Sequence, residues 1–105
     1  YKPNFVCLQE TKTAAGSSIF QGLKVEASGY NDNRHLGCET WLYTQNLIMA
    51  KTPNGTIVKC YIDKYVILIA SPRTLLILCS LKVGLLAILN VHGHDTSRHD
   101  KGIYD

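Results

Sequence analysis

The chain has 105 residues, a length that allows at most one small domain. Apolar residues make up 46% of the sequence and charged residues 18%, a balance that excludes a disordered or low-complexity protein. The formal net charge of +3 is spread along the chain without a basic block, so charge alone does not indicate binding to nucleic acid.

The first predicted element is a strand over residues 5–8 that ends in polar side chains. Its apolar residues follow Pro3 closely and lead directly into Gln9 and Glu10. A short continuous apolar run of this kind is typical of a strand buried on both faces. The strand carries the Glu10 carboxylate to its end, where a hard divalent cation can be bound for hydrolysis. The alternative is that Glu10 is ordinary solvated surface.

The second predicted element is a short crossover helix over residues 13–24. Ala15, Ile19 and Leu23 recur there at helical spacing, with Phe20 beside them. Two glycines within the segment weaken this prediction.

After the helix, the sequence predicts strands joined by tight connections. The expected strands cover residues 27–30, 38–43, 57–62, 65–70, 75–81 and 85–91. A polar surface loop is expected at residues 31–37, and Asn54-Gly55 predicts a hairpin turn. One strand–helix–strand opening followed by an antiparallel meander indicates an α+β fold.

The cysteines favour a reduced environment. Cys7, Cys38, Cys60 and Cys79 occur without any CxxC pair, and most lie in apolar or strand-like segments. Buried free thiols are therefore expected, with the disulfide set of a secreted protein as the alternative. The spacing does not match a zinc site, and no apolar run is long enough for a membrane-spanning helix.

The last predicted strand delivers His92 to its end, much as the first delivers Glu10. An imidazole changes protonation near neutral pH, so His92 is suited to hold or protonate a phosphate oxygen. The alternative is a hydrogen-bonded histidine at a strand end. His92 and His94 also match the start of a zinc-binding HxHxDH pattern, but Thr96 and Ser97 stand where two ligands are needed. The remaining histidines, His35, His94 and His99, are expected on loop surfaces.

The segment Leu-Gln-Glu-Thr-Lys at residues 8–12 resembles the metal-binding strand of the endonuclease/exonuclease/phosphatase superfamily. Residues 37–41, 71–73 and 90–92 are also similar to segments of this family, most of all in LINE-type retroelement and apurinic-type endonucleases. The resemblance implies the N-terminal half of a two-layer β-sandwich with flanking helices and mostly antiparallel strands.

The resemblance also implies roles for five side chains. Glu10 would hold a catalytic magnesium or manganese ion, and Gln9 would fix its carboxylate through a hydrogen bond. His92 would be the second catalytic residue, acting on a phosphate oxygen. Lys12 and Arg73 are candidate phosphate contacts. For Lys12 the alternative is a solvated side chain, and for Arg73 a structural contact such as one with a backbone carbonyl.

The expected function is metal-dependent hydrolysis of phosphodiesters, with DNA as the substrate, in an intracellular protein whose candidate compartment is the nucleus. Residues 1–105 would form a partial domain that lacks the family's first strand. It would also lack the C-terminal half, which supplies the Asp-x-Asn and Ser-Asp-His motifs needed for activity. Two alternatives stay open: a phosphoinositide- or sphingomyelin-type phosphoesterase of the same fold, and an inactive remnant or β-rich binding module.

Overall fold

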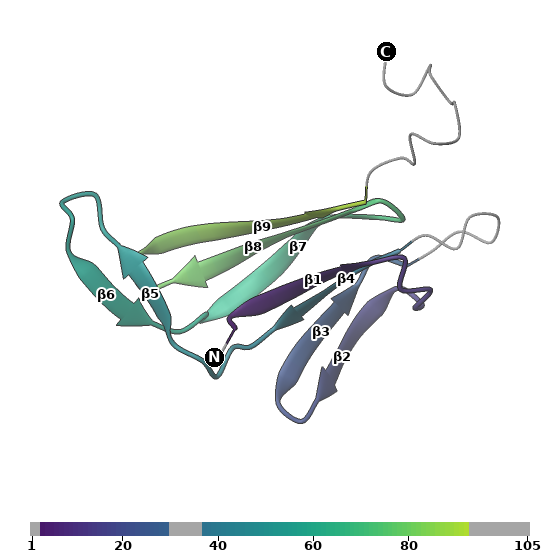
Figure 1. Cartoon of the computed structure of the whole chain (residues 1–105), viewed down its shortest axis with the longest axis horizontal. Coiled ribbons are helices and arrows are strands. Elements are labelled where there is room, and N and C mark those ends of the chain that lie inside the picture. The colour runs from purple at the N-terminus through teal and green to yellow at the C-terminus, as the bar shows by residue number, and fades with distance from the viewer. Residues whose placement is uncertain (1–2, 30–36, 93–105) are drawn as a thin grey trace, which may run out of the picture.

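The structure is a computed structural model that describes residues 3–29 and 37–92. Within these two ranges the chain forms nine β-strands in three antiparallel sheets (Figure 1). The strands are β1 (Phe5–Gln9), β2 (Gly16–Phe20), β3 (Leu23–Ala27), β4 (Cys38–Leu42), β5 (Ile48–Lys51), β6 (Ile57–Cys60), β7 (Lys64–Ser71), β8 (Thr74–Leu81) and β9 (Gly84–Val91).

The first sheet has the strand order β1-β4-β3-β2, so the opening strand pairs with β4 and not with its neighbour in sequence. In this pairing Leu8 lies opposite Glu39 and Gln9 lies opposite Cys38. Strands β5 and β6 form a separate hairpin, and β7-β8-β9 form a three-stranded meander. A bulge shifts the β7–β8 register between Ile67 and Ile69.

The four-stranded and three-stranded sheets pack against each other in two layers (Figure 1). On the central strands every second residue faces the other layer, as the two-residue period of a strand requires. These inward side chains, all at most 1% exposed, are Cys38, Thr40 and Leu42 on β4 and Leu75, Ile77 and Cys79 on β8. Burying each large aliphatic side chain contributes about 1.5–3 kcal/mol, so this interface is the main source of stability.

A buried carboxylate also links the two layers. Glu26 on β3 is 5% exposed, and its two oxygens accept hydrogen bonds of 2.6 Å from Ser17 Oγ and from the Tyr65 hydroxyl on β7. Burial, with the Glu26 hydrogen bond as the next cause, raises the pKa of Tyr65 well above its ordinary value. Tyr65 therefore keeps its proton and remains a donor, which satisfies a charge that would otherwise be costly to bury.

The α+β prediction with flanking helices is wrong, because the described residues are all-β and contain no helix. Residues 13–24, the predicted crossover helix, instead contain β2 and the start of β3. Gln21 and Gly22 connect these strands with φ angles of 51° and 82°, and two positive φ angles are what a tight type I′ hairpin turn needs. The same angles are incompatible with a right-handed helix, which overrides the apolar spacing.

Several strands also differ from the expectations. Strand β1 is an edge strand, not one buried on both faces, and Phe5 is 41% exposed. The strand expected at residues 27–30 ends earlier, at Ala27, and Tyr30 lies outside the described residues. Strand β5 was not predicted. Strand β5 pairs with β6 across the Asn54-Gly55 turn. The sequence indicates this turn and the strand after it, but not the strand before it.

The outer face of the three-stranded sheet is apolar. Its exposed side chains include Val66, Leu68, Leu85, Leu89 and Val91, each more than half exposed. Among residues 3–29 and 37–92 there is no helix long and apolar enough to cross a membrane.

Two buried thiols should make stability fall at alkaline pH. Burial raises the pKa of Cys38 and of Cys79 above their ordinary value of 9.0. The folded chain therefore holds these protons at pH values where the unfolded chain has lost them. Their stabilising contribution is complete below pH 9 and declines as pH rises above it. Urea unfolding between pH 7 and 11 should show this decline, and a Cys38→Ala/Cys79→Ala variant should show a flatter profile. An equally steep profile for the variant would contradict this origin.

Candidate functional site

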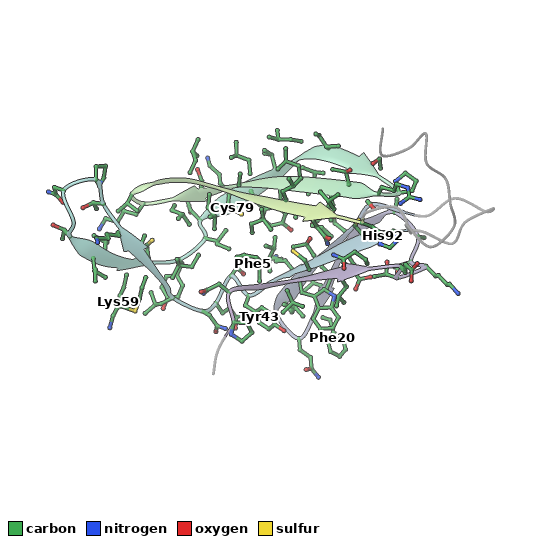
Figure 2. The ribbon with its side chains drawn as sticks, turned by 45° about the horizontal axis from the view of Figure 1, so that its top comes forward. Phe5, Phe20, Tyr43, Lys59, Cys79 and His92 are labelled. Atoms are coloured by element: carbon green, nitrogen blue, oxygen red, sulfur yellow. The ribbon has the colours of Figure 1, made fainter. Side chains whose placement is uncertain are left out.

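The ends of β1 and β9 meet at one rim of the two layers, and this places Glu10 beside His92. The carboxylate oxygen Oε1 of Glu10 lies 3.5 Å from Nε2 of His92. The Glu10 side chain is 64% exposed and the His92 side chain 23% exposed, so the pair opens to solvent. Figure 2 shows His92 at the end of β9, close to the first sheet. The two side chains thus converge at one rim, and we name this pair the rim site.

A single buried amide holds the two strands of the rim site together. Asn90 on β9 is 1% exposed and lies two residues before His92. Its Oδ1 accepts a hydrogen bond of 2.6 Å from Nε2 of Gln9, the residue before Glu10. Its Nδ2 donates to the Leu8 carbonyl at 3.2 Å, and also to the carbonyl of Glu39 at 3.1 Å. Asn90 thereby links β9 to β1 and β4, which belong to the other sheet and form no ladder of backbone hydrogen bonds with β9.

The resemblance implies that Gln9 orients the Glu10 carboxylate. In the structure, however, the side chain of Gln9 donates a hydrogen bond to Asn90. Gln9 therefore positions Glu10 through the backbone, by fixing the end of β1 against β9. Its role next to a bound metal stays a prediction. The sequence contains a signal for Asn90, because it is the one amide within the apolar run of residues 85–91.

Arg73 forms two hydrogen bonds with the main chain of His92. Arg73 lies in the turn between β7 and β8, where its carbonyl accepts a hydrogen bond of 2.8 Å from the His92 N–H. Its Nη1 donates to the His92 carbonyl at 3.3 Å. This is the backbone-carbonyl contact considered as the structural alternative for Arg73. A direct contact with phosphate stays a prediction.

The backbone after β1 adopts a conformation that is unusual for residues with side chains. Glu10 and Lys12 have φ angles of 55° and 54°, in the left-handed region. This conformation costs roughly 1–2 kcal/mol for an L-residue other than glycine. Strained residues persist where the surrounding structure over-determines them, and they cluster at functional sites. Lys12 is exposed in this segment, and its proposed contact with phosphate stays a prediction.

The cysteine below the rim site is not suited to nucleophilic chemistry. Cys38 is fully buried, and burial raises the pKa of its thiol. A hydrogen bond with the Ser28 hydroxyl and one with the His92 backbone lower the pKa by less than burial raises it. A thiol that stays protonated and out of contact with solvent packs as a small apolar group and does not attack a substrate.

The rim site offers one carboxylate to a metal ion. Within the described parts of the chain there is no group of three or more His, Cys, Asp or Glu residues that could hold a metal. Magnesium binds proteins through one or two carboxylates, with waters and substrate phosphates completing its octahedron. Glu10 therefore fits a weak, substrate-assisted magnesium site and does not fit a pre-formed one. The zinc alternative at His94 lies outside the described residues.

No family model, curated protein or solved structure matches this chain.

Proposed function

We propose that this chain carries the rim of a metal-dependent phosphodiesterase that acts on DNA. The observation that supports the proposal most is the 3.5 Å approach of the Glu10 carboxylate to the His92 imidazole. These groups come from the two different layers, and each directly follows a strand of its own layer, β1 for Glu10 and β9 for His92. An oxygen ligand next to a group that can donate a proton is the combination that phosphodiester hydrolysis needs.

In this proposal Glu10 holds the metal ion, and His92 donates a hydrogen bond or a proton to a phosphate oxygen. The bound ion would supply charge stabilisation for the developing oxyanion. Asn90 and Gln9 keep the two strand ends at a fixed separation, so that both groups reach the same phosphate. Arg73 holds the His92 backbone from the other side. Water must also be activated, and because the described residues supply one carboxylate to the rim site, we expect the 105-residue chain alone to have negligible nuclease activity.

The test is metal-dependent nicking of supercoiled plasmid by the intact protein that carries this chain. We expect relaxation in the presence of magnesium or manganese and its loss on chelation with EDTA. His92→Asn should lower the rate about a hundredfold, the range typical for losing a group that transfers a proton. His35→Asn removes an imidazole from a segment that the sequence places in a surface loop, and should leave the rate unchanged.

Two outcomes would contradict the proposal. Nicking that survives EDTA would exclude the metal, and an unchanged rate for His92→Asn would exclude its role. Release of phosphate from inositol phosphates or sphingomyelin, with no plasmid nicking, would keep the reaction class but replace DNA by a lipid-type substrate. The 105-residue chain serves as a further check, since strong activity from it alone would contradict the need for additional groups.

A further inference from the structure

A second concave site lies on the outer face of the four-stranded sheet, on the side away from β7–β9. It is an open cleft of about 700 Å³ between β2, β3, β4 and the segment that follows β4. Three aromatic rings line it: Phe20, Trp41 and Tyr43. Figure 2 shows Phe20 and Tyr43 on this side of the sheet. Phe20 is 64% exposed and lies at the end of β2, a strand whose five residues are all exposed. We name this site the aromatic cleft.

The aromatic cleft carries one negative charge, held in a fixed position. Among the described residues that line it, Glu39 is the only charged one. Its Oε1 accepts a hydrogen bond of 2.6 Å from the indole N–H of Trp41. Its main-chain carbonyl accepts a hydrogen bond from the Asn90 side chain at 3.1 Å. The carboxylate and the indole are therefore held in position next to each other, and a ligand meets them without first ordering them.

The combination of ring faces and a carboxylate favours a positively charged ligand. The face of an aromatic ring is the negative end of its quadrupole and attracts cations within about 6 Å, with tryptophan the strongest. A carboxylate next to these rings adds direct attraction for a cation. It also repels phosphate groups, so the aromatic cleft is unsuited to the DNA backbone that the rim site is proposed to bind. Gln21, Gln45 and Asn46 at its edge supply neutral hydrogen-bonding groups.

We propose that the aromatic cleft binds an organic cation of the quaternary or alkylated ammonium class, with Glu39 and Trp41 as its principal contacts. Such a cation is weakly hydrated, so it loses little on leaving water, and its methyl groups pack on the rings of Phe20 and Tyr43. The proposal does not depend on the function of the rim site, because none of these four side chains belongs to it.

Equilibrium dialysis of the 105-residue chain against choline, at constant ionic strength, tests the proposal. We expect saturable binding in the millimolar range, as for a cation on a partly exposed aromatic site. The neutral isostere 3,3-dimethylbutan-1-ol has the same shape without the charge and should bind at least fivefold more weakly. Trp41 is the only tryptophan in the sequence, so quenching of its fluorescence by choline should follow the same curve.

Two variants separate charge from packing. Glu39→Gln keeps the side-chain size and should weaken choline binding about fivefold while leaving the isostere unaffected. Asp63→Asn removes an exposed carboxylate that does not line the aromatic cleft, and choline binding should not change. Circular dichroism shows whether each variant is folded. Three results would each overturn the proposal. The first is equal affinity for choline and its isostere, and the second is an unchanged choline affinity for folded Glu39→Gln. The third is quenching of the Trp41 fluorescence by adenosine, a neutral aromatic ligand, without quenching by choline.

Discussion

Replacing Asn90 by leucine should lower the free energy of unfolding by about 3–5 kcal/mol, although leucine is apolar and similar in volume. The change would leave the Leu8 and Glu39 carbonyls without the partner that Asn90 provides, whereas the amide of the exposed residue Gln9 can turn to water. Each buried polar group that loses its partner costs about 1–3 kcal/mol. The total is a large part of the 5–15 kcal/mol that holds a typical domain. Urea unfolding followed by circular dichroism measures it.

Two comparisons identify the hydrogen bonds as the cause. Ile88→Val, on the same strand and equally buried, removes one methylene and should cost only about 0.5–1.5 kcal/mol. Gln9→Met combined with Asn90→Leu removes both ends of one hydrogen bond, and should cost less than the sum of the two single changes. A cost for Asn90→Leu no greater than that of Ile88→Val would contradict the linking role of this amide.

Glu10→Gly should have opposite effects on stability and on activity. The proposed nuclease activity of the intact protein should fall by roughly a thousandfold or more, because the proposed metal site would lose the carboxylate that the described residues supply to it. The free energy of unfolding should rise by up to about 1 kcal/mol, because glycine adopts a φ of 55° without strain. The exposed ion pair with His92 contributes little against this gain, since such pairs are worth about 0–1 kcal/mol.

Two variants separate the backbone effect from the loss of charge. Glu10→Gln removes the charge but keeps a side chain in the left-handed conformation, so it should lose activity without gaining stability. Gln21→Gly relieves the same strain at a φ of 51° in the β2–β3 turn, away from the rim site. It should gain stability and keep the nuclease rate. A Glu10→Gly variant that is less stable than Glu10→Gln would show that the φ of Glu10 is not strained.

The strands with strong local patterns were predictable from the sequence. Residues 38–43, 65–70, 75–81 and 85–91 are apolar or alternating runs bounded by turn residues, and β4, β7, β8 and β9 occupy them to within one residue at either end. The proximity of Glu10 and His92 also agrees with the resemblance, which assigns both residues to one catalytic site.

The errors arose where non-local pairing or turn chemistry decided the structure. Apolar residues four apart at Ala15, Ile19 and Leu23 fit a helix, but the Gln21-Gly22 turn places Ile19 in β2 and Leu23 in β3, and Ala15 precedes both strands. Reading that turn as I′ is difficult because glutamine is not a favoured residue at positive φ. The pairing of β1 with β4 could not be derived, since strand order in a sheet depends on contacts distant in sequence. The aromatic cleft depends on this order, because β2, β3 and β4 form its floor.

Because Glu10 belongs to one layer and His92 to the other, the distance between them depends on the spacing of the two layers. Side chains such as Leu42 and Ile77, at 0% exposure in the interior, act as spacers that set this distance. A larger or smaller side chain at either position would change the geometry of the rim site without altering Glu10 or His92. The size of the buried apolar side chains therefore helps to set the distance between the two proposed catalytic groups.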